Sequence, residues 1–183
     1  MTLRGIRVEY TRVTRKLKDY RSIVEIMRTS FPPEERIPIW VLHLLSRKKN
    51  VNFNAWYDNK ELCGITYTIE SEKVIFLLYF AVNAQLRSKG YGSRILEEIK
   101  KTAGKKEILI NVEKPDECAE NNMQRVRRIA FYERNGFYRS GFDLRIGGTD
   151  YLVFSTSEIP DRKEFSNIIK KYHFGQIQMT DIS

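Results

Sequence analysis

The run from Val74 to Val82 constrains the fold more than any other part of the sequence. It reads Val-Ile-Phe-Leu-Leu-Tyr-Phe-Ala-Val, so an extended strand here carries apolar side chains on both faces. Such a strand lies in the centre of a sheet that is covered on both sides. It is also too short to cross a membrane, which takes about 20 apolar residues in a helix. We therefore expect a sheet with helices on both faces.

Strand and helix patterns surround this run. Apolar runs bounded by turn residues predict strands, and apolar residues at helical spacing predict helices. The predicted strands are 5–13, 51–57, 62–69, 74–82, 108–112, 137–146 and 151–156. The predicted helices are 16–30, one from about 34 or 38 to 48, 93–103, 120–135 and a short one from Phe165 to Tyr172. The predicted fold class is α/β of the α+β kind, with a mixed, mostly antiparallel central sheet and helices on both faces.

Length and composition favour one ordinary globular domain. The chain has 183 residues, of which 42% are hydrophobic and 30% charged, values that exclude fibrous and wholly disordered proteins. Without repeats or Gly/Ser linkers, we expect a single domain over 1–183. Within it, 157–183 would hold a C-terminal helix that packs on the domain or on a second subunit of a homodimer.

The cysteines and the N-terminal residues bear on location and metals. Cys63 and Cys118 cannot form a disulfide framework, and neither has a cysteine or histidine at metal-ligand spacing. The first residues lack the pattern of a signal peptide. We therefore expect a cytoplasmic protein in a reducing compartment, with no metal and no membrane segment.

The net charge is +9, which suggests a polyanionic partner. Residues 84–106 carry seven basic and two acidic residues, and residues 125–139 carry five basic and one acidic residue. A phosphorylated small molecule, an acidic membrane surface and a nucleic acid would all fit this excess. The position of the basic residues along the chain distinguishes these three partners.

The first basic window contains a turn that is suited to an anion. The segment Val82-Asn83-Ala84-Gln85-Leu86-Arg87-Ser88-Lys89-Gly90-Tyr91-Gly92-Ser93 leads from the central strand into a helix. A helix N-terminus presents backbone N–H groups that have no partner in the helix. Gly90 and Gly92 would let a pyrophosphate approach the backbone, and Arg87 and Lys89 add positive charge. Ordinary turn chemistry explains two glycines equally well, and the spacing matches neither a Walker loop nor a dinucleotide fingerprint.

The segment Ala130-Phe131-Tyr132-Glu133-Arg134-Asn135-Gly136-Phe137 adds a second motif. Together the two resemble the GNAT superfamily of acyl-CoA-dependent N-acetyltransferases. In that family a strand ending in valine is followed five residues later by Arg or Gln, and then by two residues and Gly-x-Gly. Val82, Arg87, Gly90 and Gly92 match in register. A later aromatic-Tyr-x-x-x-Gly-Phe pattern matches 131–137, and the order of elements agrees over nearly the whole chain.

The resemblance implies that acetyl-CoA is the co-substrate. Backbone groups near Phe80, Ala81 and Val82 would pair with the pantetheine arm, and the turn would bind the pyrophosphate. The cofactor-binding residues implied are Phe80, Ala81, Val82, Arg87, Ser88, Lys89, Gly90, Tyr91, Gly92, Ser93, Arg125 and Tyr132.

Arg125 marks a departure from the family, which often has asparagine at this position. Arg125, Arg128 and Tyr132 share one face of the predicted helix, and one of the two arginines would reach a phosphate. A solvated arginine face explains the same pattern. Ala84 replaces a proline that many members have, which removes rigidity only.

Tyr132 is the expected general acid for the departing CoA thiolate, because a phenol is matched to a thiol leaving group. The alternative is a tyrosine that only packs in the core. The base that takes the amine proton is left open among Glu113, Glu34, Glu35 and a water chain to solvent. Glu35, Tyr79 and Asn111 are the expected acceptor-binding residues, and Tyr79 fits core packing as well.

The predicted function is transfer of an acetyl group from acetyl-CoA to a primary amine by direct attack in a ternary complex. The acceptor would be a small-molecule or peptide amine, and a protein acetyltransferase acting on ribosomal protein N-termini is the alternative enzyme. A nucleic-acid-binding module and an acyl-CoA sensor without activity are the alternatives outside the enzymes, and we do not expect nucleic acid as the partner.

Overall fold

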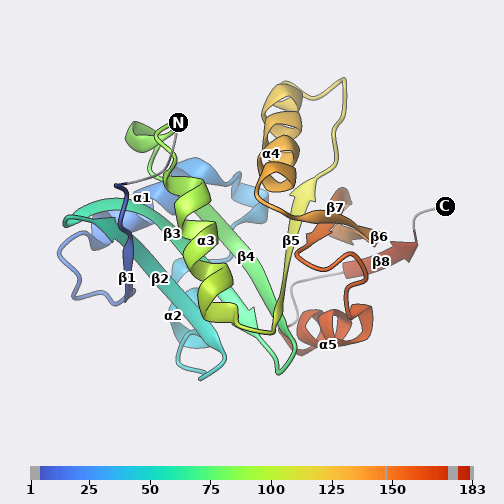
Figure 1. Cartoon of the computed structure of the whole chain (residues 1–183), viewed down its shortest axis with the longest axis horizontal. Helices are drawn as coiled ribbons and strands as arrows, with labels where there is room; N and C mark the ends of the chain where they lie inside the picture. The colour runs from blue at the N-terminus through green and yellow to red at the C-terminus, as the bar shows by residue number, and fades with distance from the viewer. Residues whose placement is uncertain (1–4, 147, 173–176, 182–183) are drawn as a thin grey trace. The chain divides into compact units, whose positions relative to one another are not determined.

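The computed structural model describes residues 5–146, 148–172 and 177–181. They group into two compact units (Figure 1). Unit 1 comprises residues up to 69 and 78–104, and unit 2 comprises 70–77 and the residues from 105 onward. The prediction of a single domain stays a prediction, and the two units are described separately.

Eight strands are found among the described residues. They are β1 (Glu9–Arg12), β2 (Val51–Asp58), β3 (Glu61–Glu70), β4 (Val74–Val82), β5 (Glu107–Glu113), β6 (Tyr138–Ile146), β7 (Thr149–Ser155) and β8 (Ile177–Asp181). Hydrogen-bonded neighbours follow the order β1-β2-β3-β4-β5-β7-β6-β8. The pair β4–β5 is parallel, whereas β1–β2, β2–β3, β5–β7, β6–β7 and β6–β8 are antiparallel. The predicted mixed, mostly antiparallel sheet is confirmed.

Five α-helices and two 3-10 turns complete the described elements. The helices are α1 (Tyr20–Ser30), α2 (Ile39–Leu45), α3 (Tyr91–Ala103), α4 (Asn122–Arg134) and α5 (Arg162–Tyr172). The 3-10 turns are η1 (Pro33–Glu35) and η2 (Ala84–Leu86).

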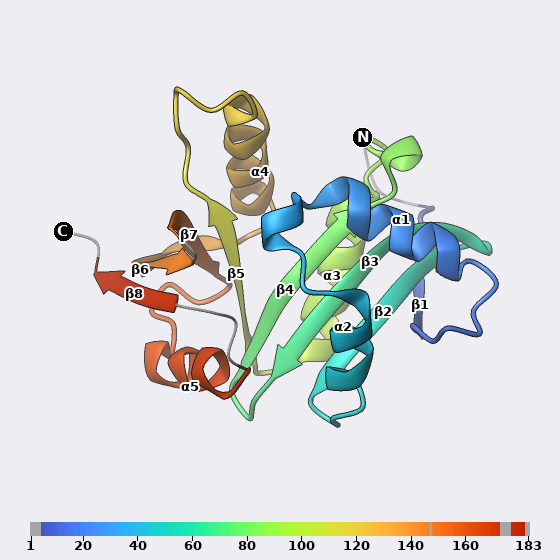
Figure 2. The same ribbon diagram turned by 180° about the vertical axis from the view of Figure 1, so that it is seen from behind.

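Unit 1 is a sheet with a helical layer on each face. Figure 1 shows α3 in front of the strands β2 to β4, and Figure 2 shows α1 and α2 on the opposite side. The helix α3 buries Ile95, Leu96, Ile99 and Ala103 along one stripe and ends at Gly104, where φ is +61°. The helix α1 ends at Ser30, and its C-cap Phe31 is extended because a proline follows it.

Unit 2 is built around β5, β7 and β6, with α5 packed through its apolar face. Phe165, Ile168, Ile169 and Tyr172 of α5 are buried. The Phe165 ring meets the Phe76 ring edge-on, with centroids 5.0 Å apart. The parallel pairing of β4 with β5 lies here, from Val74 opposite Glu107 to Phe76 opposite Leu109. The predicted parallel pairing of the strands before and after α3 is therefore confirmed.

The strand β8 and several element ends differ from the sequence-based prediction. Residues 177–181, inside the segment expected to end in a helix, form a strand that pairs with β6 from Ile146 to Phe142. The alternation of Ile177 and Met179 with polar neighbours was the available signal, and it is weak in five residues. The first strand is shorter than predicted, and α3 begins at Tyr91, two residues before the predicted start.

Candidate active site

The turn after β4 is fixed by Asn83. Its backbone N–H donates to the Cys63 carbonyl (2.8 Å), and its side-chain amide donates to the Leu62 carbonyl (3.0 Å). The Asn83 side-chain oxygen accepts from the Gln85 backbone N–H (3.2 Å) and so caps η2. These bonds anchor the predicted anion-binding turn to β3. The sequence assigns no role to Asn83, since Leu62, whose carbonyl its side chain bonds, lies 21 residues away.

The backbone of the turn has two left-handed residues. Ser88 has φ +63°, a conformation that costs a non-glycine residue energy, and Gly90 has φ +90°. Gly90 is the N-cap of α3, and no side chain caps this helix end. The first amides of α3 therefore have neither an intrahelical nor a capping partner, which suits them to an anion. Gly92 and Ser93 lie in this first turn.

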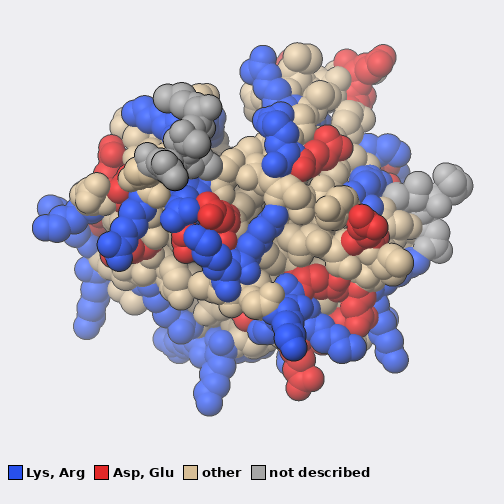
Figure 3. All heavy atoms as spheres, in the orientation of Figure 1, with Lys and Arg blue, Asp and Glu red and all other residues tan. Residues whose placement is uncertain are grey.

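The cations in the turn differ from those on the helix that follows. Arg87 and Lys89 make no ion pair with any residue that the structure describes. Farther along α3, Arg94 pairs with Glu97 and Glu98 (2.6 and 2.9 Å), and Lys101 pairs with the same two carboxylates. Basic and acidic side chains also stand side by side on the face in Figure 3. The charge available to an external anion is therefore concentrated in the turn more than the sequence window indicates.

Gly64 lets the backbone of β3 approach the end of β4 closely, which the sequence did not reveal. A Cβ at Gly64 would lie 2.5 Å from the Ala81 carbonyl oxygen, so the two backbones are in close approach. Phe80, Ala81 and Val82 are the residues expected to pair with pantetheine. A side chain at Gly64 would displace this stretch of backbone.

The Tyr91 side chain is hydrogen-bonded to β2. Its hydroxyl donates to the Asp58 carboxylate (3.0 Å), and burial together with this bond raises the pKa of Tyr91 to about 12. The contact holds the first residue of α3 against the end of β2. Within unit 1 the structure thus brings the predicted cofactor residues from Phe80 to Ser93 into one continuous strand, turn and helix start.

In unit 2, Tyr132 lies on α4 and is buried, with 4% of its surface exposed. Its ring contacts Phe131 and Phe137 edge-on, at 5.2 and 5.6 Å between centroids. Burial raises the pKa of Tyr132 above its ordinary value, while nearby Arg128 acts in the opposite direction. Its hydroxyl has no hydrogen bond to any residue that the structure describes. The hydroxyl is therefore held protonated and is not committed to another group.

The Gly136-Phe137 pair explains why the second motif has its spacing. Gly136 has φ +69°, which ends α4 with a left-handed residue, and the Phe137 N–H donates to the Tyr132 carbonyl (3.1 Å). Phe137 then packs back on the Tyr132 ring. The motif therefore fixes the tyrosine side chain from both the backbone and the ring side.

Glu113 is engaged in an ion-pair network. Its carboxylate lies 3.0 Å from Arg125 Nη2 and 3.9 Å from Arg128 Nη1. Arg125 also donates from Nε to the Asn121 side chain and from Nη1 to the Lys114 carbonyl, both at 2.9 Å. The side chains of Glu113 and Arg125 are 10% and 16% exposed. Each part of the Arg125 guanidinium therefore has a protein partner, whereas Arg128 is more accessible.

The predicted acceptor residues have varied surroundings. Tyr79 is buried, and its hydroxyl donates to the Glu35 carbonyl (2.7 Å) and accepts from the Ile37 N–H (2.9 Å). Glu34 lies in η1, with its side chain outside the described part of the structure. Asn111 lies on β5 opposite Val153, and its side-chain oxygen is buried without a hydrogen-bond partner in the part of the chain that the structure describes.

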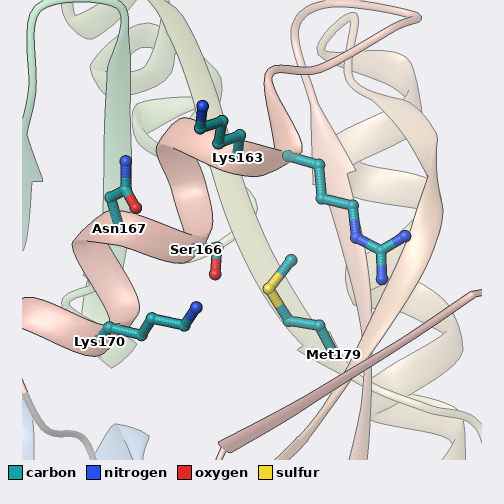
Figure 4. Close-up of a pocket in the computed structure, with 6 residues that line it drawn as sticks. Lys163, Ser166, Asn167, Lys170 and Met179 are labelled. Atoms are coloured by element: carbon teal, nitrogen blue, oxygen red, sulfur yellow. The ribbon is translucent and has the colours of Figure 1, made fainter.

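A groove of about 530 Å³ lies between α5 and β8 (Figure 4). Its lining consists of Arg162, Lys163, Ser166, Asn167, Lys170 and Met179. None of the residues predicted for the site belongs to it. Among the described residues, no helix is long and apolar enough to span a bilayer, and no group of three His, Cys, Asp or Glu side chains could hold a metal ion.

Comparison with known proteins identifies the family. A family model for the acetyltransferase (GNAT) domain matches residues 49–139, which include both motifs. A search of curated protein sequences gives no significant match.

Solved structures agree with this result. A GNAT-family protein from Bacteroides thetaiotaomicron is 25% identical, with a TM-score of 0.67, over 90% of this chain and 96% of that one. A GNAT family acetyltransferase from Elizabethkingia anophelis with acetyl-CoA bound is 11% identical, with a TM-score of 0.58, over 82% and 97% of the two chains. The ribosomal-protein-S18-alanine N-acetyltransferase from Escherichia coli is 15% identical, with a TM-score of 0.55, over 81% and 92%. The two motifs, the confirmed fold and the family match lead to one conclusion: the chain belongs to the GNAT superfamily of acetyltransferases.

Proposed function

We propose that this protein transfers the acetyl group of acetyl-CoA to a primary amine by direct attack in a ternary complex. The observation that carries the proposal is the turn from Arg87 to Ser93. It joins uncapped helix amides to two cations that are not paired with any described residue, at the end of the central strand. Such a turn suits the pyrophosphate of coenzyme A.

Each part of the cofactor has proposed partners. Backbone groups of Phe80, Ala81 and Val82 pair with the pantetheine amides as an added strand would. The amides of 88–93 bind the pyrophosphate, and Arg87 and Lys89 contact its oxygens. On α4, the more accessible Arg128 is better placed than Arg125 to reach a phosphate, because Arg125 is already bonded to Glu113, Asn121 and Lys114.

The chemical step needs a neutral amine and an acid. The amine nitrogen attacks the thioester carbonyl carbon, and the resulting oxyanion accepts a hydrogen bond from a backbone N–H near Val82. A base takes the proton of the attacking nitrogen, and the carbon–sulfur bond breaks as the thiolate takes the Tyr132 phenol proton. The proton released by the base then returns through solvent to the Tyr132 phenolate. Burial keeps the Tyr132 phenol protonated until the thiolate forms, and the same raised pKa makes it a weaker acid toward that thiolate.

The general base is not assigned to one residue, but the ion pairs of Glu113 make it a weaker candidate. A proton taken by Glu113 would weaken its pairing with Arg125 and Arg128, so we assign Glu113 to holding these arginines. Glu34 or a water chain then takes the amine proton. The unpartnered oxygen of Asn111 supports an acceptor role, because it would accept a hydrogen bond from an amine N–H.

The test is thiol release from acetyl-CoA with a panel of amines: amino acids, peptides, polyamines and aminoglycosides. We expect at least one acceptor to release CoA in proportion to acetylated product. Stabilisation by acetyl-CoA without release from any amine would instead support the sensor alternative. Absence of both stabilisation and release would overturn the proposal. A cytoplasmic location and a homodimer stay predictions.

A further inference from the structure

The segment between α1 and α2 is fastened to β4 by one side chain. The Tyr79 hydroxyl bonds the backbone on both sides of Arg36, donating to the Glu35 carbonyl and accepting from the Ile37 N–H. The Phe31 ring meets the Tyr79 ring edge-on, 4.8 Å between centroids. The Arg36 N–H also closes η1 by donating to the Pro33 carbonyl (3.3 Å). The backbone of Arg36 is therefore fixed in place.

The Arg36 side chain has no counter-ion among the described side chains, which do not include that of Glu34. Its Nε atom is buried and has no hydrogen-bond partner among the described residues. The guanidinium makes no ion pair with any acidic side chain that the structure describes. An arginine stays charged at every physiological pH. Leaving a buried donor of a charged group unpaired costs stability, so such a group calls for an explanation.

The Nε atom itself is inaccessible, but Arg36 as a whole is only part-buried, so an external oxyanion would pair with the outer nitrogens of the guanidinium. The planar guanidinium fork matches a carboxylate or a phosphate with two parallel hydrogen bonds. Tyr79, which holds Arg36, directly precedes Phe80 to Val82, where the thioester is proposed to bind. An anionic group on Arg36 would therefore belong to a molecule that lies near the reacting end of the acetyl-CoA.

We propose that Arg36 binds an oxyanion of the acceptor, so that the acceptor is an amine that also carries a negative charge. The inference rests on the proposed function and narrows its acceptor class. Amino acids, acidic peptides and phosphorylated amines fit it. Polyamines and aminoglycosides do not, because their added positive charges repel the guanidinium.

The experiment compares matched amines that differ only in the anionic group. Glycine is paired with glycinamide, glutamate with its diamide and phosphoethanolamine with ethanolamine, and spermidine and kanamycin represent the polycations. The two oxyanion arms distinguish a carboxylate from a phosphate. Wild type should favour the anionic member of at least one pair by about 10- to 100-fold in kcat/KM, the expected value of a charged hydrogen bond.

Three variants separate binding from folding. Arg36→Gln should abolish the preference for the anionic member, and Arg36→Lys should restore part of it. Arg47→Gln makes the same charge change at an exposed position and should leave the preference intact. Because Arg36 lacks a partner in the protein, the melting temperature of Arg36→Gln should equal or exceed that of wild type. Stabilisation by acetyl-CoA should be equal in all four proteins.

Two results would overturn the inference while leaving the proposed function standing. One is a preference for amides or polycations in wild type, and the other is an unchanged anionic preference in Arg36→Gln. If no amine is turned over, the decisive measurement is how far the anionic amines raise the melting temperature of the CoA complex. The increase must be larger for wild type than for Arg36→Gln, and equal increases refute the inference. Absence of any stabilisation by acetyl-CoA would instead refute the proposed function itself.

Discussion

The turn after β4 in unit 1 and the α4 region in unit 2 each carry residues with proposed roles, yet they are built differently. The turn offers backbone amides and cations that have no described ion-pair partner, and its shape comes from Asn83, Ser88 and Gly90. The α4 region offers buried side chains, with Arg125 and Glu113 bonded to each other. A site made of backbone amides can be predicted from the turn residues in the sequence. The role of a side chain depends on its partners, which only the fold reveals.

The largest effect on stability should come from the network in unit 2. Glu113→Gln leaves the mostly buried Arg125 without its carboxylate, and breaking a buried ion pair costs about 3 kcal/mol. Urea denaturation measures this loss. Glu133→Gln, at an exposed position of α4, the helix that carries Arg125, should change stability by less than about 0.5 kcal/mol.

The same variant also tests the role of Glu113 in the reaction. If Glu113 holds the arginines, folded Glu113→Gln should show a raised KM for acetyl-CoA with kcat reduced by less than about tenfold. A loss of kcat by about 100-fold or more with unchanged KM would mean that Glu113 is the general base.

Tyr132→Phe separates chemistry from packing in the same region. Removing the phenol proton should lower kcat by about 100-fold, equivalent to about 2.7 kcal/mol in the barrier. Stability should hardly change, because the hydroxyl bonds to no described residue. Tyr138→Phe, at an exposed position, is the matched control. Full turnover by folded Tyr132→Phe would leave Tyr132 with a packing role only.

The two ends of α3 allow a matched test of the turn in unit 1. Gly90 and Gly104 both have positive φ, so alanine at either position should cost about 1–2 kcal/mol. Only Gly90→Ala should also weaken acetyl-CoA binding, by about tenfold, because it distorts the amides of the turn. Isothermal titration calorimetry measures both affinities. Equal affinities in the two variants would contradict the assigned role of the turn.

The smallest effect concerns the Tyr79 contact at high pH. Burial raises the pKa of Tyr79 to about 12, above the value near 10 of an unfolded tyrosine. The folded state thus holds the proton more tightly, so the stability from Tyr79 is complete below pH 10 and is lost as the pH rises toward 12. Tyr79→Phe should show a shallower loss of stability than wild type between pH 10 and 12. Identical slopes would contradict this assignment.

The same contrast explains what the sequence could predict. The apolar run of β4, the stripes of α1 and α3 and the glycines at 90 and 136 each follow from local rules, and the fold class was predicted from them. The strand β8 was missed because five residues carry too little periodicity. The roles of Asn83, Gly64 and Arg36 were missed because each depends on distant backbone, namely β3, Ala81 and the segment that Tyr79 holds.

The central claim is that the turn from Arg87 to Ser93 binds the pyrophosphate of acetyl-CoA through its backbone. Amide hydrogen exchange, measured with and without saturating acetyl-CoA, tests it most directly. We predict that the amides of 88–93 become strongly protected, and that Gly90→Ala reduces this protection while Gly104→Ala does not. Acetyl-CoA binding with unchanged exchange in this turn, or protection confined to the groove beside α5, would contradict the claim.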